Sequence, residues 1–379
     1  MSSDDRSIPL FLDCDPGIDD AVALAYLFCQ PDVDIVGIVA SGGNVPTAQV
    51  VRNTHGWIEL AGRTAIPVHP GRDLPLACDD GTDSQPEYAE ATHGESGAGY
   101  ARLPHLHSPV SEVSAAEAWV EAARSHAGEL IGVVIGPTTN LAHALTIEPE
   151  LPRLVRRLFI MGGAFNYRGN TRPTTEWNVS FDPEATSRVL SSFGTAFTEG
   201  TAGHLPVIAP IEATEAIEMT PERLAEILAA GNETDSSWGE LLSQLGEALR
   251  FYFEFHESDG LSFIAHLHDP FALACAISWA RDHLGGSRSE TALGSADPGG
   301  EITKRGAAIP IGTPGALPWS RTMFAPVDVE LTGTLTRGET VADWLGRWGR
   351  EANAEIIRAI DAREFLDHLG DTLKKGPPR

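Results

Sequence analysis

Short apolar runs alternate with helix-forming segments along this chain, and no other feature of the sequence restricts its fold as strongly. Residues 8–12 form an apolar run typical of a buried strand, and residues 21–28 are helix-forming. Residues 33–40 repeat the strand pattern, and residues 47–61 place apolar side chains at helical spacing. The alternation continues, with strands expected at 66–69, 130–135, 154–161 and 206–211 and helices at 114–125, 140–146, 183–192 and 221–230. This pattern predicts an α/β fold: an open, mostly parallel sheet with helices on both faces.

Polar residues follow several of the expected strands. The acidic stretch 13–20 comes after the first strand, and Gly43 and Asn44 come after the second. Residues 136–140 and 161–163 follow two later strands. Because ligands of open α/β sheets bind at the carboxyl ends of the strands, we predict an active site at that edge.

No linker divides the sequence convincingly. We therefore expect a single domain over residues 1–371, followed by a frayed tail at 372–379. Two stretches rich in Gly, Pro and Ser, at 78–111 and 285–318, are longer than ordinary connections. Segments of that length are typical of functional loops or insertions.

The charge balance narrows the range of partners. The 53 acidic and 27 basic residues give a formal net charge of -26. Such a field repels phosphate backbones and anionic lipid, and it favours metal cations or neutral substrates. We expect no nucleic-acid partner and no membrane partner.

The lack of a recognisable targeting signal and the pattern of cysteines predict a cytoplasmic protein. The first seven residues are polar and are not followed by a signal-type apolar run. The longest apolar stretches fall well short of the roughly 20 residues that cross a bilayer. The four cysteines show neither CxxC spacing nor the density of a disulfide scaffold, which favours reduced thiols and gives no support for structural zinc.

Asp13, Asp15, Asp19 and Asp20 place four carboxylates within eight residues. Their mutual repulsion requires compensation, in part by a helix N-terminus and more strongly by a divalent cation. An all-oxygen set selects Ca²⁺ or Mg²⁺ over zinc. The alternative is a solvated group of helix-capping residues. Asp269 in the His268-Asp269-Pro270 segment is a candidate to complete the cation site from a distant element, although this tripeptide is also common as a helix cap.

The stretch 161–182 offers amide and carboxylate groups of the kind that bind sugar hydroxyls. These groups are Asn170, Glu176 and Asn178. In a glycine-rich loop, the same residue types also serve plain turn chemistry. His93 lies in a second glycine-rich segment, 92–99, which has the composition of a lid, although a single loop histidine is often merely solvated.

Five motifs occur along the chain: DCDPGIDDA at 13–21, GPTTNLA at 136–142, MGG at 161–163, EWNVSFDPEA at 176–185 and HDPFALA at 268–274. Together they resemble the nucleoside hydrolase family of the inosine-uridine preferring type. Their order and separations agree from about residue 8 to about residue 366, including the segment 327–343. The resemblance implies one open α/β domain, a bound Ca²⁺, and cleavage by water of the N-glycosidic bond of purine and/or pyrimidine ribonucleosides to ribose and free base. By analogy it also implies a homodimer or homotetramer.

The resemblance assigns roles to individual positions. Asp15 corresponds to a calcium ligand that is also the general base for a calcium-bound water, and Asp20 and Asp269 correspond to further ligands. Thr139 would contribute its backbone carbonyl, and Asp13 would support the loop. The positions implied for the sugar are Asp19, Asn44, Met161, Asn170, Glu176 and Asn178. His268 matches a position associated with the leaving base, and His93 matches a lid histidine near the base, which favours a broad or inosine-uridine preference.

The chain also departs from the family pattern. Residues 193–204 and 285–321 look like insertions, and the second lies near the wall that usually contacts the base. The preferred base therefore stays open. The aromatic segment 251–256 offers side chains that stack on a base, but aromatic residues at helical spacing also belong to cores.

Two rival functions remain. Asp13-Cys14-Asp15 has the DxD spacing of a Mg²⁺-dependent phosphohydrolase, but that reading leaves Asp19, Asp20 and the 176–178 segment unexplained. The chain also has no evident downstream lysine that would hold the phosphate of a phosphohydrolase substrate. The second rival is a catalytically silent, calcium-dependent nucleoside- or sugar-binding protein.

Overall fold

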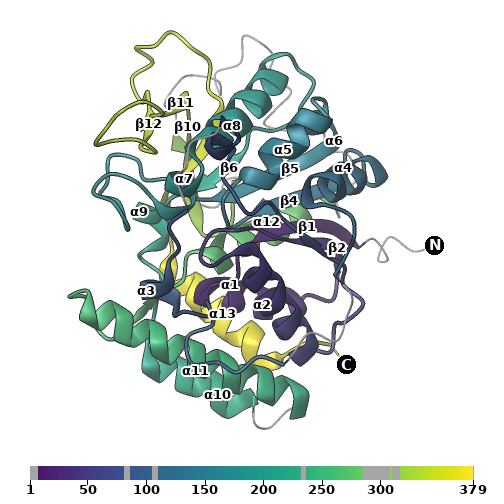
Figure 1. The fold of residues 1–379 in the computed structure, drawn as a ribbon, viewed down its shortest axis with the longest axis vertical. Helices are drawn as coiled ribbons and strands as arrows, with labels where there is room; N and C mark the ends of the chain where they lie inside the picture. Colours follow the sequence, from purple (N-terminus) through teal and green to yellow (C-terminus); the bar gives the residue numbers. More distant parts are fainter. Residues whose placement is uncertain are drawn as a thin grey trace.

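A nine-stranded sheet forms the centre of the protein (Figure 1). The computed structural model describes residues 7–80, 86–104, 110–231, 236–284, 308–309 and 316–378. The strand order is β3-β2-β1-β4-β5-β6-β13-β10-β9. Strands β3 to β13 in this order run parallel, and β10 and β9 close the edge in antiparallel pairs.

The strands of this sheet are β1 (Ile8–Cys14), β2 (Val33–Ala40), β3 (Val68–Pro70), β4 (Leu130–Val134), β5 (Val155–Met161), β6 (Val207–Ala209), β9 (Ala308–Ile309), β10 (Ser320–Ala325) and β13 (Ala354–Ile360). Two small antiparallel pairs lie outside it: β7 (Glu218–Met219) with β8 (Ala265–His266), and β11 (Val327–Val329) with β12 (Thr340–Ala342).

Helices cover both faces of the sheet (Figure 1). On one side lie α1 (Ile18–Phe28), α2 (Thr47–Leu60), α12 (Asp269–Leu284) and α13 (Ala362–Lys375), and α10 (Pro221–Gly231) and α11 (Ser236–Ser258) pack on these helices as an outer layer. The other packs against α4 (Ala115–Ser125), α5 (Thr139–Ile147), α6 (Leu151–Leu154) and α8 (Pro183–Thr198). The remaining short helices are α3 (Glu90–His93), α7 (Trp177–Phe181), α9 (Ile211–Thr214) and the 3₁₀ turn Leu76–Asp80.

The two faces hold separate hydrophobic cores because strand side chains alternate in direction. In β1, Leu10 and Leu12 point into the core beneath α1, whereas Phe11 points into the core beneath α4. In β4, Ile131 and Val133 likewise belong to the first core. Strands buried on both faces read as continuous apolar runs, which is what the sequence shows.

The strand order reverses at β1, and this reversal positions the site. β1 pairs with β2 on one side and with β4 on the other. The loops that leave neighbouring strands at such a point separate and open a crevice at their carboxyl ends. The acidic segment that follows β1 opens directly into it.

The structure confirms the predicted fold class. Each strand expected between residues 8 and 211 is present, most within one or two residues of the expected bounds. The sequence analysis did not predict β13 and β10, which extend the sheet beyond β6.

The structure shows where three segment predictions fall, and one of them lies partly outside the described residues. The expected frayed tail is helical to Lys375, because Leu373 is buried and its carbonyl accepts a hydrogen bond from Trp238 Nε1 (3.1 Å). The expected insertion at 193–204 begins as the end of α8, where Phe193 packs into the core. Within 285–321, only 308–309 and 316–321 are described, and they contain β9 and the start of β10.

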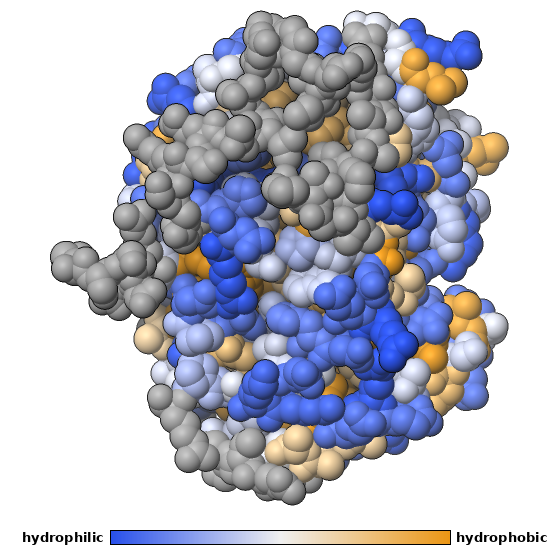
Figure 2. Space-filling model, turned by 180° about the vertical axis from the view of Figure 1, so that it is seen from behind, coloured by the Kyte–Doolittle hydropathy of each residue, from blue (hydrophilic) through white to orange (hydrophobic). Residues whose placement is uncertain are grey.

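The described surface opposite the view of Figure 1 is mainly hydrophilic, with small scattered apolar patches (Figure 2). Among the described residues, no helix combines the length and apolar character required to span a membrane.

Candidate active site

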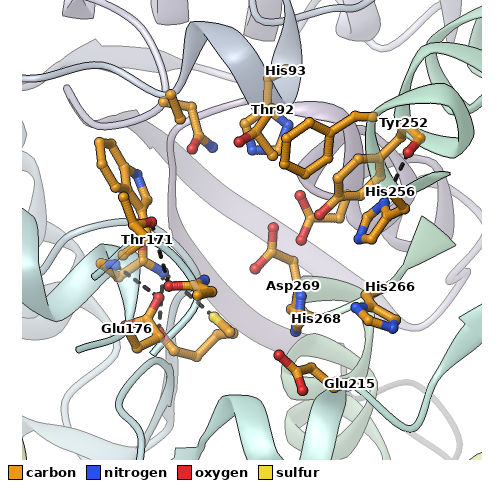
Figure 3. A pocket seen from close by; sticks show the side chains of 18 of the residues that line it. Thr92, His93, Thr171, Glu176, Glu215, Tyr252, His256, His266, His268 and Asp269 are labelled. Atoms are coloured by element: carbon orange, nitrogen blue, oxygen red, sulfur yellow. Dashed lines mark hydrogen bonds between the residues drawn. The ribbon is translucent and has the colours of Figure 1, made fainter. Parts of the chain in front are cut away.

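A pocket opens at the carboxyl edge of the parallel strands (Figure 3). Its volume is about 420 Å³, within the roughly 300–1,000 Å³ typical of small-molecule sites. Nine of the sequence-predicted residues line it: Asp19, Asn44, His93, Met161, Asn170, Glu176, Asn178, His268 and Asp269. Segments far apart in the sequence therefore meet at one cavity.

The side chain of Asp20 holds the turn between β1 and α1. Its two oxygens accept hydrogen bonds from the backbone N–H groups of Asp15 (3.1 Å) and Gly17 (3.0 Å). The backbone N–H of Asn44 donates to Asp15 Oδ2 (2.8 Å). Asp15 Oδ1 is buried and has no hydrogen-bond partner within the described residues. An unpaired buried carboxylate oxygen is costly, so this atom is available for a ligand.

Three carboxylates converge near Asp15, close enough for their charges to act on it. Asp19, Asp20 and Asp269 each offer an oxygen, and these oxygens lie within 4.8 Å of one another. Burial raises the pKa of Asp20 to about 6, and burial together with the charge of Asp20 raises the pKa of Asp19 to about 7. Burial and neighbouring carboxylates raise the pKa values of Asp15 and Asp269 well above their usual range. The charged cluster therefore needs a cation, and its all-oxygen donor set fits Ca²⁺ or Mg²⁺.

The geometry differs in one respect from the predicted ligand set of Asp15, Asp20, Thr139 and Asp269. The group of three contains Asp19 and does not contain Asp15. Thr139 lies at the start of α5, and its hydroxyl donates to Asp182 Oδ2 (2.8 Å), which fixes the turn that carries its carbonyl.

Asp13 lies beneath the site and does not line the pocket. Its carboxylate accepts hydrogen bonds from Ser41 Oγ, Trp119 Nε1 (2.9 Å) and Asn140 Nδ2 (3.4 Å). Burial raises its pKa to about 6, against the opposing effect of these donors. Asp13 therefore ties β1 to the segments that follow β2 and β4, in keeping with the supporting role expected of it.

Amide and carboxylate groups form the opposite wall. Glu176 caps α7 and accepts from the backbone N–H groups of Asn178 (2.8 Å), Gly163 (2.9 Å) and Val179 (3.1 Å). The Asn178 amide donates to the carbonyls of Ile135 (2.9 Å) and Met161 (3.3 Å). Its amide oxygen is therefore left to accept a hydrogen bond from a ligand. The side chains of this segment therefore both stabilise its turn and line the pocket.

Asn170 is the exposed member of that wall. Its amide oxygen accepts a hydrogen bond from Thr171 Oγ1 (3.4 Å), and both residues line the pocket. Asn170 lies at the rim, whereas Asn178 and Met161 lie at depth.

His93 is buried at the end of α3 and is not a solvated loop residue. Its Nδ1 accepts a hydrogen bond from the backbone N–H of Ile18 (3.1 Å). Burial lowers its pKa to about 3, so the ring is neutral at pH 7. With Nδ1 acting as acceptor, the proton resides on Nε2, which makes that nitrogen a donor.

His268 precedes α12, next to Asp269. Its Nδ1 lies 2.7 Å from Thr214 Oγ1, and burial lowers its pKa well below the usual range. His268 therefore combines contact with the pocket and adjacency to the carboxylate cluster.

The aromatic segment 251–256 was expected either to stack on a base or to belong to the core, and His266 was not singled out from the sequence. Tyr252, Phe255 and His256 on α11 line the cavity, as does His266 on β8. Phe253, from the same aromatic segment, belongs to the core. Segment 251–256 therefore supplies both pocket residues and core residues. Which side chains face the pocket depends on the path of α11 and could not be predicted from their spacing. No local signal marked His266.

Comparison with known proteins gives the same family as the sequence motifs. Residues 10–367 match the family described as "Inosine-uridine preferring nucleoside hydrolase". The chain belongs to the nucleoside hydrolase family. The match spans every strand of the parallel sheet and all predicted site residues.

Relatives of this nucleoside hydrolase are similar over nearly their whole length. The chain is 30% identical over 370 residues to the pyrimidine-specific ribonucleoside hydrolase RihA of Shigella flexneri, which covers 97% of this chain and 99% of that protein. It is equally similar to RihA of Escherichia coli. Among solved structures, the plant nucleoside hydrolase PpNRh1 matches with a TM-score of 0.76 at 23% identity, over 97% of this chain and 98% of that one. A purine-preferring ribonucleoside hydrolase from Gardnerella vaginalis matches with a TM-score of 0.74 at 23% identity and the same coverage.

Proposed function

We propose that this chain hydrolyses the N-glycosidic bond of purine and/or pyrimidine ribonucleosides to ribose and free base. The observation that carries the proposal is the pocket itself. Groups that bind hydroxyls, on Asn44, Glu176 and Asn178, share a cavity with the carboxylates of Asp19 and Asp269. A ribose ring bound between these walls would be surrounded by hydrogen-bonding groups and negative charge.

That arrangement suits the chemistry of N-glycoside cleavage. The sugar acquires oxocarbenium character as the bond breaks, and nearby carboxylates stabilise this positive charge. Water must lose a proton as it attacks the sugar. Asp15 has a buried oxygen without a protein partner, and we assign it the role of general base.

We propose Asp15, Asp20, Asp269 and the carbonyl of Thr139 as the residues that hold Ca²⁺. Asp19 lies close enough to the same oxygens to share this role or to bind a ribose hydroxyl beside them. When bound, the ion supplies positive charge that offsets the carboxylates and makes nearby water more acidic.

We expect purified protein to contain about one Ca²⁺ per chain, because the buried carboxylates repel one another without a cation. Elemental analysis measures the content, and chelation should lower both the melting temperature and the activity. Asp269→Asn should reduce the calcium content. Asp282→Asn, an exposed position on the same helix, should retain it. Zinc in place of calcium, or full activity after exhaustive chelation, would contradict the assignment.

Gly43→Ala should lower kcat by about tenfold while leaving the protein folded, because a small displacement of a catalytic group is costly. A Cβ at Gly43 would lie 2.1 Å from Asp15 Oδ2 and would displace this carboxylate. Gly203→Ala is the matched control, since its Cβ would meet no atom within 4 Å. Equal kcat values for the two variants would show that the position of Asp15 does not limit the reaction.

The pocket also bears on the rival functions. Its lining among the described residues contains one arginine, Arg168, and no lysine, which disfavours a phosphohydrolase. A silent binding protein would bind nucleosides without releasing ribose. Assaying reducing sugar with inosine, uridine, cytidine and adenosine, and phosphate release with phosphate monoesters, separates these possibilities. The single domain and the homodimer or homotetramer stay predictions.

A further inference from the structure

Three imidazole rings form a row along one side of the pocket (Figure 3). The ring centroids of His256 and His266 are 4.7 Å apart, and those of His266 and His268 are 5.9 Å apart. His266 and His268 alternate with Leu267, which is fully buried in the core. The extended backbone thus turns both histidines toward the cavity, where they meet His256 from α11.

The proton on His256 can be assigned from its contacts. His256 Nδ1 lies 2.8 Å from the backbone carbonyl of Tyr252, one helical turn earlier. A carbonyl only accepts, so Nδ1 must donate. Burial lowers the pKa of His256, and the ring therefore carries no second proton at pH 7. Nε2 is then left with a lone pair and acts as an acceptor.

His266 complements this acceptor. Burial, followed by the charges of His256 and Arg168, lowers its pKa to about 4, so this ring is also neutral. Neither of its nitrogens has a hydrogen-bond partner within the described residues. A neutral imidazole carries one N–H donor and one acceptor, and here the tautomer is not fixed by the protein. The pair can therefore offer a fixed acceptor and an adjacent donor.

The side chains of His256 and His266 are only 4% and 7% exposed, but their unpaired nitrogens are not fully enclosed and can be reached from the cavity. Their unpaired atoms belong to residues that line the pocket, so a bound ligand is the natural partner. Under the proposed function, that ligand is a nucleoside. The groups proposed to bind the sugar, on Asn44, Glu176 and Asn178, come from other elements of the pocket, so the base is the part left to meet His256 and His266.

We propose that His256 is a specificity-determining residue that accepts a hydrogen bond from an N–H group on the edge of the nucleobase, with His266 donating to the neighbouring acceptor. This proposal rests on the proposed ribonucleoside hydrolysis. It requires a base with a free N–H at that edge, whether ring or exocyclic. Bases alkylated at this nitrogen should be poor substrates.

The test compares a nucleoside with its N-methylated analogue. The pair is built on the nucleoside that the wild type cleaves fastest: uridine with 3-methyluridine, inosine with 1-methylinosine, or cytidine or adenosine with its N,N-dimethyl derivative. We expect the wild type to prefer the parent by roughly ten- to hundredfold in kcat/KM, the effect of leaving a buried acceptor unpaired. His256→Ala removes the acceptor and makes room for the methyl group. It should lower kcat/KM for the parent and bring the two rates close together.

Two further variants separate recognition from folding. His256→Gln retains an acceptor and should keep part of the preference. His283→Ala removes a histidine with the same type of contact, Nδ1 to the Trp279 carbonyl one turn earlier (2.7 Å), at the far end of α12 and outside the pocket lining. It should leave the preference unchanged. p-Nitrophenyl riboside has no N–H edge, and its cleavage should change by less than about threefold in His256→Ala.

Each result decides the matter. If His256→Ala keeps the wild-type preference for the parent nucleoside, His256 does not read the N–H group. If p-nitrophenyl riboside cleavage falls in parallel with that of the nucleoside, His256 acts on the general structure of the site, and the proposal is wrong. If the wild type releases ribose from no riboside at all, the proposed function itself fails and the specificity role with it.

Discussion

Asp15→Asn is expected to lose about three orders of magnitude in kcat with every ribonucleoside that the wild type cleaves. The substitution keeps the size of the side chain but converts the carboxylate to an amide. The amide oxygen left in place of the buried, unpartnered carboxylate oxygen is too weakly basic to accept the proton, and negative charge is lost from the proposed ion site. Steady-state kinetics at saturating Ca²⁺ measures the loss of catalysis separately from weakened ion binding.

The matched control is Asp34→Asn, which makes the same change at an exposed position on β2. It should retain wild-type kcat. Calcium content and melting temperature should be recorded for both variants, so that unfolding is not mistaken for lost chemistry. Near-normal turnover by folded, calcium-loaded Asp15→Asn would show that another group accepts the proton.

His268→Ala is expected to slow the cleavage of a natural nucleoside by about two orders of magnitude, the scale of general acid catalysis. A nucleobase anion leaves poorly, so the base needs a proton or a hydrogen bond as the bond breaks. His268 lines the pocket and is held by Thr214 Oγ1, and it stands at the inner end of the histidine row. Burial lowers the pKa of His268 well below its usual range, so we place the neutral ring as a hydrogen-bond donor to the leaving base or as part of the network that delivers the proton.

A substrate with a good leaving group isolates this role. p-Nitrophenolate departs without much help, so p-nitrophenyl riboside cleavage should be affected far less by His268→Ala. If His268 merely orients Asp269, both substrates should slow together as the ion site loosens. Equal losses in kcat/KM at saturating Ca²⁺ would therefore reject the leaving-group role and keep the hydrolase assignment.

The fold could largely be predicted because its strands carry their own signal. β1 and β4 are buried throughout, and β2 and β5 are buried over their carboxyl-terminal halves, which produces apolar runs that are visible without knowledge of their neighbours. β13 differs, because its last three residues are only partly buried and it joins the sheet between β6 and an antiparallel β10. That placement depends on pairing partners rather than on the strand's own pattern.

The site residues likewise differ in how far the sequence predicts them. Asp13, Asp15, Asp19 and Asp20 cluster in the sequence, so the strand–loop–helix unit that carries them already predicts an acidic site. Asp269 joins them from the start of α12; its sequence marked it only as a candidate ligand or a helix cap, and the family resemblance favoured the ligand role. His256 and His266 have no such marker, because their rings come together only through the paths of α11 and β8. The acidic residues were predictable from their own segments, whereas His256 and His266 were not assigned individually.

The source of the new oxygen atom on the sugar tests the central claim most directly. The calcium-loaded protein is incubated with inosine, uridine, cytidine and adenosine in phosphate buffer made with ¹⁸O-labelled water, and the products are analysed by mass spectrometry under conditions that limit exchange at the anomeric carbon. The account predicts free ribose carrying one ¹⁸O atom, with an equal amount of unlabelled free base, from at least one of these nucleosides. Formation of ribose 1-phosphate, or no release of base from any of the four, would contradict it.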